Sequence, residues 1–394
     1  MKTTMDKIAE LLERRVDKVY PSKKALEKVL RSGKKIRLYL GIDPTAKRLH
    51  LGHTVPLRTL QAFADLGHEA IFLFGDGTVL VGDPSEREAG RKQITEKEIK
   101  KNISTWKKQM TPVVNFRKVK IKHNKDWLTK LTLKELIEIG SKISAIQLFK
   151  RDNFQERLKK GDTVLFHETM YPLLQGYDSV AMDVDLEIGG SDQTFNMLMG
   201  RELQKKFRNK EKYVLTLKMI KGTDGRKMSK TFGNCIWLTD TVQDIYGRIM
   251  RISDDLIAQY FEFFTSLPID EVKKIQNEVK TRPMELKKKL AFTICSELNG
   301  EKKASQAESQ FKTIHQDRGV PEKIKEIDLK TGEWNLLKLL IKSTLVSSKS
   351  EAKRLIKQGA VSLNLKRIKD INKKVNLSSG DVLKTGKRSF IKIK

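Results

Sequence analysis

Two short stretches of the sequence carry side chains suited to binding a nucleotide phosphate. In the first, His50 and His53 flank Leu51-Gly52 after an alternating apolar run, residues 36–42, and an Asp-Pro break. Apolar residues recur at helical spacing from Leu51 onward, so the histidines should lie on the first turn of a helix that follows a strand. The helix N-terminus favours an anion, Gly52 lets a ligand approach the backbone, and both imidazoles can donate hydrogen bonds.

The second stretch, residues 221–234 (KGTDGRKMSKTFGN), is a glycine-containing loop that follows the strand-like sequence YVLTLKMI. Lysines on such a loop, Lys227 and Lys230 among them, can close over a triphosphate and neutralise charge that develops on it. Each stretch has a simpler explanation when taken alone. Two histidines at this spacing are often ordinary surface residues or part of a metal site, and a basic loop is often merely solvated.

Further polar side chains occupy positions where a ligand could meet them. Tyr171, Gln175 and Asp178 are spaced i, i+4 and i+7 within a mostly helical segment, residues 143–182, so they share one helix face. That face should line a pocket, because buried unpaired polar groups cost stability, although a solvated face explains the spacing equally well. Asp192, after the strand-like VDLEIGG, can accept from ribose hydroxyls or act as a helix N-cap.

The order of these segments predicts an α/β fold built on a doubly wound parallel sheet. Strand-like runs alternate with amphipathic helical runs, with strands at 36–42, 69–75 and 119–123 and helices at 95–111 and 132–145. A strand, a helix and a strand in this order form a right-handed βαβ unit. Ligands of such sheets bind beyond the carboxyl ends of the strands, which is where His53 and Asp83 are expected.

Composition narrows the class of protein. The 394 residues, 38% hydrophobic and 32% charged, fit a globular protein of two or three domains, and no apolar run is long enough to span a membrane. The amphipathic N-terminus lacks a signal-peptide core, so a cytoplasmic protein is expected. Cys235 and Cys295 indicate neither a disulfide framework nor a thiolate metal site, and should be small buried residues.

The net charge indicates a polyanionic partner. A formal charge of +30 is most simply explained this way, although lysine-rich proteomes produce such a charge without one. The excess is concentrated, because residues 351–394 hold thirteen Lys and Arg against three Asp and Glu. A basic helix is expected from Ser348 to Lys357, with Gly359 turning the chain into a strand. This distribution is typical of a nucleic-acid-binding module, although a run of solvated charge would look similar.

Taken together, HLGH and KMSKT resemble the two signatures of class I aminoacyl-tRNA synthetases, and they stand in the expected order. Within that class, the sequence resembles the bacterial-type tyrosyl-tRNA synthetases over essentially the whole chain. The likeness rests on YLGIDPTAKRLHLGH, GDGTVLVGDPS, YPLLQGYDS, IGGSDQTFN and KMSKTFGN. Thr231 stands where the family usually has serine. Glu86-Arg87-Glu88 stands where it commonly has Gly-Lys, which leaves a phosphate role for Arg87 open.

The resemblance implies roles for individual residues. Tyr39 and Asp178 would reach the phenolic hydroxyl of L-tyrosine, and phenylalanine would leave this pair unsatisfied. The ammonium group of the substrate would be held by Asp83, Tyr171, Gln175 and Gln193. ATP would be bound by Gly41, Asp43, His50, His53, Gly190, Asp192, Lys227 and Lys230, with Thr45 beside the two histidines.

The implied reaction is the ATP-dependent attachment of L-tyrosine to tRNA(Tyr). The tyrosine carboxylate would attack the α-phosphate, giving tyrosyl-adenylate and pyrophosphate, and the terminal ribose of the tRNA would then take the tyrosyl group and release AMP. No protein nucleophile is needed, so catalysis would rest on positioning and charge stabilisation. Mg²⁺ would accompany ATP without a dedicated protein cage or a tightly bound metal. The family also implies a homodimer.

The resemblance divides the chain into a Rossmann-like catalytic domain (1–236), a helical anticodon-side domain (237–318), a linker (319–333) and an S4-like RNA-binding domain (334–394). In the last of these, phosphates would be faced by Lys353, Arg354 and Lys357. Two alternatives remain. A tryptophanyl-tRNA synthetase shares the fold and signatures, but Tyr39 with Asp178 and the S4-like tail argue against it. A catalytically silent RNA-binding relative would not need both ATP signatures.

Overall fold

The computed structural model describes residues 4–84, 94–315, 324–386 and 389–394. Arg87, whose phosphate role the sequence leaves open, lies outside these residues. The chain forms two compact units, Met1–Gly300 and Glu301–Lys394, and each is described by itself. No helix in the described part of the chain is long and apolar enough to cross a bilayer.

The first unit is built on a six-stranded sheet with the order β1-β6-β5-β2-β3-β4. Its strands are β1 (Val16–Tyr20), β2 (Arg37–Ile42), β3 (Glu69–Phe74), β4 (Val119–His123), β5 (Leu186–Gly190) and β6 (Tyr213–Leu217). The pairs β2–β3, β3–β4, β2–β5 and β5–β6 are all parallel, which confirms the predicted doubly wound sheet. Only β1 runs antiparallel, against β6. The sequence did not predict β1, because a half-exposed, charged edge strand carries a weak apolar signal.

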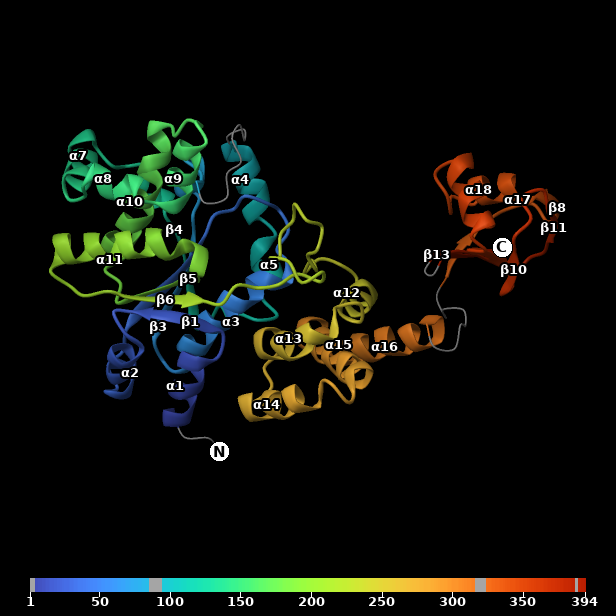
Figure 1. Ribbon diagram of the computed structural model, residues 1–394, viewed down its shortest axis with the longest axis horizontal. Helices are drawn as coiled ribbons and strands as arrows, with labels where there is room; N and C mark the ends of the chain where they lie inside the picture. The colour runs from blue at the N-terminus through green and yellow to red at the C-terminus, as the bar shows by residue number, and fades with distance from the viewer. Residues whose placement is uncertain (1–3, 85–93, 316–323, 387–388) are drawn as a thin grey trace. The chain divides into compact units, whose positions relative to one another are not determined.

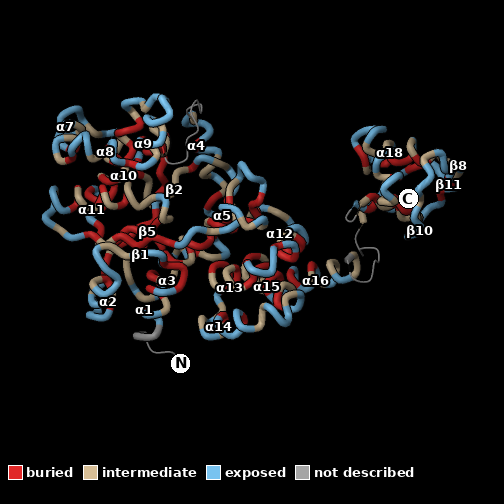
Figure 2. Tube along the Cα trace, viewed as in Figure 1, coloured by how far each residue is buried: buried red, intermediate tan, exposed pale blue. Residues whose placement is uncertain are grey.

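Helices cover both sides of this sheet, with α10 and α11 on one side and α1 to α3 on the other (Figure 1). In chain order they are α1 (Thr4–Glu13), α2 (Lys23–Arg31), α3 (Thr54–Asp65), α4 (Glu96–Ile103), α5 (Trp106–Met110), α6 (Lys125–Leu128), α7 (Leu133–Ser141), α8 (Ala145–Phe149), α9 (Asp152–Lys159), α10 (Phe166–Met182) and α11 (Thr194–Arg208). Because both faces are covered, the central strands are buried on both sides (Figure 2), and even Tyr39, on the face opposite Leu38 and Leu40, is only 1% exposed.

The helix predicted over 95–111 is instead two helices, α4 and α5, which are separated at Ser104 and Thr105. Both hydroxyls donate to backbone carbonyls, Ser104 to Lys101 at 2.8 Å and Thr105 to Lys47 at 3.2 Å. Side-chain bonds of this kind compete with the helical ladder, and they explain why the apolar periodicity alone was misleading. The two cysteines are buried, as predicted.

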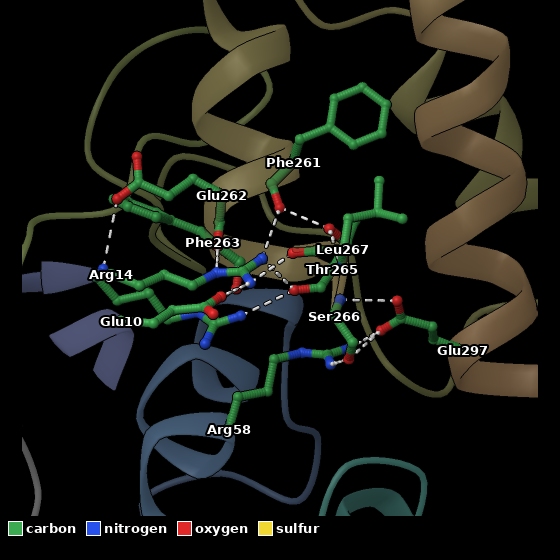
Figure 3. Close-up of polar contacts among 11 residues, drawn as sticks. Glu10, Arg14, Arg58, Phe261, Glu262, Phe263, Thr265, Ser266, Leu267 and Glu297 are labelled. Atoms are coloured by element: carbon green, nitrogen blue, oxygen red, sulfur yellow. Dashed lines mark hydrogen bonds and ion pairs between the residues drawn. The ribbon is translucent and has the colours of Figure 1, made fainter. Parts of the chain in front are cut away.

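Four further helices complete the first unit, namely α12 (Val242–Ile249), α13 (Ile257–Phe264), α14 (Ile269–Glu278) and α15 (Pro283–Asn299). Arg14, at the end of α1, reaches the last turn of α13 (Figure 3). Its guanidinium donates to the carbonyls of Glu262 (2.9 Å), Thr265 (2.7 Å) and Leu267 (2.6 Å). The last carbonyls of a helix lack partners within it and carry partial negative charge. A buried cation therefore joins the sheet domain to the helices that follow it.

The second unit contains α16 (Glu301–His315), α17 (Leu336–Lys342), α18 (Lys349–Lys357) and two small sheets. The larger sheet has the order β10-β9-β12-β13-β7, and the smaller pairs β11 with β8. These strands are β7 (Lys325–Ile327), β8 (Gly332–Asn335), β9 (Val361–Leu363), β10 (Lys366–Ile368), β11 (Lys374–Leu377), β12 (Val382–Thr385) and β13 (Ser389–Ile393). The basic helix after Ser348 and the left-handed turn at Gly359 are where the sequence predicted them.

The proposed linker differs from what the structure describes. Residues 319–323 lie outside the described chain, but 325–327 form β7, and β8 begins at Gly332. Leu329, between them, is buried in the core of the second unit. The domain boundaries drawn from the sequence at 236 and 318 stay a prediction.

Replacing Arg14 with alanine should lower the free energy of unfolding by about 2–4 kcal/mol, because several buried carbonyls would lose a charged donor. Urea unfolding followed by circular dichroism measures this. Arg282→Ala is the matched control, since Arg282 is half exposed and pairs with Glu278 and Glu285 at the surface. Its cost should stay below about 1 kcal/mol. Equal losses in the two variants would contradict the role assigned to Arg14.

Candidate active site

A cleft of about 470 Å³ opens at the carboxyl ends of β2 and β5. Twelve of the residues predicted from the sequence line it, namely Tyr39, Gly41, Asp43, Thr45, His53, Asp83, Tyr171, Gln175, Asp178, Gly190, Asp192 and Gln193. The polar face of α10 therefore lines a pocket and is not solvated. His50, Lys227 and Lys230 are not among the lining residues, and the structure places them beside the cleft through the contacts described next.

The two histidines lie together where the chain enters α3. A short 3-10 turn, η1 (Leu51–His53), precedes the α-helix. The helical conformation therefore begins where the sequence predicted it, but its first turn is 3-10 and not α-helical. The imidazole rings are 3.9 Å apart, and the backbone N–H of His50 donates to Nδ1 of His53 at 3.1 Å.

Both histidines are held in the neutral form. Burial, then the neighbouring imidazole and the positive charge of Lys230, lower the pKa of His50 to about 2. Burial also lowers the pKa of His53 to about 4. At neutral pH these rings therefore offer N–H groups and lone pairs to a ligand, and no charge.

Backbone hydrogen bonds tie the histidine segment to the chain that follows the lysine loop. Leu51 N–H donates to the carbonyl of Ile236 at 2.7 Å, and Leu238 N–H donates to the carbonyl of Leu49 at 2.9 Å. Two motifs that are far apart in sequence are therefore neighbours in space. This proximity is what a single triphosphate site requires.

Asn234 fixes the shape of the lysine loop from inside. Its amide accepts from Ser229 N–H at 2.9 Å and donates to Asp224 at 2.7 Å and to the carbonyl of Lys227 at 3.0 Å. The loop meets the cleft through Lys227, whose ammonium group lies 3.0 Å from the carboxylate of Asp192.

At the deep end of the cleft, Asp178 is 2% exposed and accepts two hydrogen bonds. Asn124 donates to one carboxylate oxygen at 3.1 Å and Trp127 donates to the other at 2.9 Å. Burial raises the pKa of Asp178 well above its ordinary value, and these two donors oppose the shift. Tyr39 is buried there too, with its hydroxyl 3.1 Å from Ser179 Oγ.

Acidic groups with fixed partners form the other end of the cleft. Asp83 accepts from Gln193 at 2.6 Å and from Arg151 at 3.0 Å. Tyr171 donates to Asp43 at 3.1 Å. Asp83 lies beyond a further 3-10 turn, Thr78–Leu80, and so is not directly at the end of β3 as expected.

Gln175 is held so that one of its amide atoms remains available. Its Nε2 donates to Glu187 at 3.1 Å. Its Oε1 is buried, and within the described chain it has no hydrogen-bond partner. The cleft therefore contains a buried acceptor with spare capacity.

Sequence reasoning missed several residues that hold these groups. Asn124 directly follows β4, and the rule that ligands meet strand ends could have found it. Trp127, Arg151, Glu187 and Lys212 gave no local signal, because their partners come from elements distant in sequence. Across the described residues, no group of three or more His, Cys, Asp or Glu is arranged to hold a metal ion.

In the second unit, the three basic residues predicted to face phosphates are neighbours. Lys353, Arg354 and Lys357 line one hollow of this unit, together with Gln358 and Asn372. The clustering on one side of α18 places three positive charges where one polyanion can reach them all.

Comparison with known proteins decides the family. Residues 31–316 match the family model of class I tRNA synthetases of the W and Y type. The chain belongs to this family of class I tRNA synthetases. Residues 316–392 match the model of the SYY-like C-terminal domain of tyrosine–tRNA ligases. The resemblance drawn from the motifs is therefore confirmed.

Individual relatives of this synthetase family cover nearly the whole chain. It is 40% identical over 376 residues to a tyrosine–tRNA ligase of Desulfotalea psychrophila, covering 94% of this chain and 93% of the relative. It is 36% identical over 394 residues to one of Thermotoga maritima, covering 99% and 98%. Among solved structures, a C-terminally truncated mitochondrial tyrosyl-tRNA synthetase of Coccidioides posadasii matches with a TM-score of 0.64 at 26% identity, covering 77% of this chain and 91% of that one.

The neutral histidines predict a dependence of stability on pH. An unfolded histidine takes up its proton near pH 6.5, whereas folded His53 does so near pH 4 and His50 near pH 2. Because the unfolded chain binds more protons in this range, stability should fall on acidification below pH 6.5, by about 1–2 kcal/mol for each histidine between pH 7 and pH 5.

Urea unfolding at the two pH values tests this dependence. The double variant His50→Asn/His53→Asn should lose clearly less stability on acidification than the wild type. An unchanged loss in the double variant would show that other groups cause it.

Proposed function

We propose that this chain attaches L-tyrosine to tRNA through a tyrosyl-adenylate made from ATP. The proposal rests on the deep end of the cleft. There the buried hydroxyl of Tyr39 and the buried carboxylate of Asp178 line the same space. Tyr39 and Asp178 together can hydrogen-bond a phenol. Phenylalanine would leave both groups buried without a partner, which is costly.

The geometry supports an orientation for the amino acid. With its phenol at Tyr39 and Asp178, its ammonium group would meet Asp83 and the unpartnered Oε1 of Gln175. Tyr171 and Gln193 would act there by holding the carboxylates of Asp43 and Asp83 in place. The substrate carboxylate is then directed toward the histidines and the lysine loop.

Catalysis would rest on charge and position, with no protein nucleophile. Since the two histidines are neutral, they would donate N–H groups to phosphate oxygens. The positive charge that stabilises the transition state would come from Lys227 and Lys230, and from Mg²⁺ that enters with ATP. Gly190 and Asp192 would take the ribose, and Gly41, Asp43 and Thr45 would line the nucleotide side of the cleft. As a translation enzyme the protein would work in the cytoplasm.

ATP–pyrophosphate exchange tests the amino-acid specificity. The wild type should exchange with tyrosine, and not measurably with phenylalanine or tryptophan. Asp178→Ala should lower kcat/KM for tyrosine by about 100-fold, as expected for the loss of a hydrogen bond to a charged group. Asp126→Ala, an exposed carboxylate on α6 near the cleft, should leave exchange unchanged. Exchange with tryptophan alone would favour the alternative specificity, and no exchange at all would refute a ligase.

We further propose that the hollow formed by Lys353, Arg354 and Lys357 binds the phosphate backbone of the tRNA. Replacing all three with alanine should weaken tRNA binding about tenfold or more and reduce the dependence of affinity on salt. Filter binding at several salt concentrations measures both. Replacing the exposed Lys273 and Lys274 of α14 and Lys280 just after it removes the same charge elsewhere and should have a smaller effect. Equal effects would mean that only net charge matters.

The homodimer implied by the family is also a proposal, and exposed apolar side chains on α7 to α10 support it. Leu133 is 74% exposed, Ile146 72% and Phe166 81%, and all three come from neighbouring elements (Figure 1). A second copy of the chain would cover such a face, since monomers rarely expose large apolar patches.

Sedimentation velocity tests the dimer. The wild type should sediment at twice the chain mass of 45.3 kDa. Ile146→Glu/Phe166→Glu should shift it toward the monomer, because burying two carboxylates in an apolar interface is unfavourable. Met284→Glu, at an exposed apolar position on α15, should remain dimeric. A monomeric wild type would refute the proposal.

A further inference from the structure

An ion pair lies buried directly behind the amino-acid end of the cleft. The side chain of Lys212 is 0% exposed, and its ammonium group contacts the carboxylate of Glu187 on β5. The same ammonium group donates to Ser179 Oγ on α10 at 2.7 Å. Burying a charged pair costs free energy and often adds little stability compared with apolar residues of similar volume. A role in orienting the groups around it is therefore worth examining.

The first branch from Lys212 leads through Glu187 to Gln175. One carboxylate oxygen of Glu187 contacts the ammonium group of Lys212. The other accepts a hydrogen bond from Gln175 Nε2 at 3.1 Å. An ionised carboxylate can only accept, so it requires the NH₂ end of the amide to face it. The carbonyl end, Oε1, is thereby left unpartnered for the substrate. Without Lys212 to hold this carboxylate in place, the amide could turn and present NH₂ to the substrate ammonium.

The second branch leads through Ser179 to Tyr39. In the described part of the chain, the polar neighbours of Ser179 Oγ are the ammonium of Lys212 and the hydroxyl of Tyr39. An ammonium group cannot accept a hydrogen bond, so the proton of Ser179 has only the oxygen of Tyr39 to go to. Tyr39 accepts from Ser179, so its own proton points away from Ser179, toward the substrate hydroxyl and the carboxylate of Glu187. Asp178 remains as the acceptor of that hydroxyl's proton.

The surrounding structure makes room for this ammonium group. A Cβ atom at Gly200 on α11 would lie 2.5 Å from Lys212 Nζ and 2.7 Å from Ser179 Oγ, so any side chain there would displace the groups of this network. Burial lowers the pKa of Lys212, and the charge of Glu187 opposes that shift. Asp178 also stabilises the ammonium, whereas Arg201 disfavours it.

We propose that Lys212 is a positioning residue for tyrosine recognition, which holds the carboxylate of Glu187 to orient the amide of Gln175 and fixes Ser179 to orient the hydroxyl proton of Tyr39. One buried cation thereby determines that Gln175 offers an acceptor to the ammonium group of the substrate and that Tyr39 offers a donor to its hydroxyl. The inference rests on the proposed function and names a determinant of its specificity.

The experiment measures KM for tyrosine by ATP–pyrophosphate exchange, from pH 6 to pH 9, in the full-length chain. Lys212→Met removes the charge and nearly keeps the volume. Glu187 then loses the ammonium group that holds its carboxylate, and the amide of Gln175 is free to turn. We expect KM for tyrosine to rise about tenfold or more across this pH range, whereas KM for ATP stays within about twofold.

Two further variants separate this role from a merely structural one. In Glu187→Gln/Lys212→Met the pair is neutral, so the chain should fold, but the amide of Gln175 is no longer fixed. KM for tyrosine should therefore stay high. Ser179→Ala should lower the preference for tyrosine over phenylalanine about tenfold, because the proton of Tyr39 is no longer directed. Lys210→Met, which breaks the surface pairs with Asp183 and Asp185, is the control and should behave as the wild type.

The outcomes are distinguishable. Exchange absent in the wild type would refute the proposed function itself. Tyrosine-dependent exchange in the wild type, with an unchanged KM for tyrosine in Lys212→Met and in the double variant, would overturn the role of Lys212. If Lys212→Met fails to fold, the KM for tyrosine of the double variant and the amino-acid preference of Ser179→Ala still test the role of Lys212.

Discussion

Two backbone hydrogen bonds, between the segments at Leu49–Leu51 and Ile236–Leu238, are the constraint on which the site depends. They are independent of side-chain chemistry, yet they bring the histidine turn and the base of the lysine loop together. A triphosphate lying between the two segments would meet neutral N–H donors on one side and ammonium groups on the other.

The electrostatics of the cleft are divided in space. Carboxylates from Asp83, Asp178 and Glu187 line the part of the cleft proposed to take the amino acid, and each accepts hydrogen bonds from neighbouring side chains. The basic groups lie at the nucleotide end, on the loop that Asn234 shapes. An amino acid with a positive ammonium group and a negative carboxylate would be drawn into one orientation by this separation alone. The donors hold these carboxylates in place against their mutual repulsion.

Much of the framework could be read from the sequence, because it depends on local periodicity. The strands at β2, β3 and β4 and the polar face of α10 were all predicted, since alternation and helical spacing are local signals. The edge strand β1 and the break between α4 and α5 were not, because tertiary hydrogen bonds decide them. In the site, Tyr171, Gln175 and Asp178 could be found by spacing. Glu187 and Lys212 could not, because each becomes meaningful only beside the other and beside α10. The roles of the individual residues toward tyrosine and ATP stay predictions.

The packing around Gly200 on α11 limits which substitutions related sequences can carry. The ammonium group of Lys212 occupies the space that any side chain at position 200 would need. The two positions should therefore vary together among related sequences. Where a relative carries a shorter residue in place of Lys212, position 200 gains room for alanine once Ser179 Oγ, 2.7 Å from the same Cβ, also moves aside. The carboxylate at position 187 loses its counter-ion in the same change, so three positions on β5, α11 and the approach to β6 form one unit of substitution.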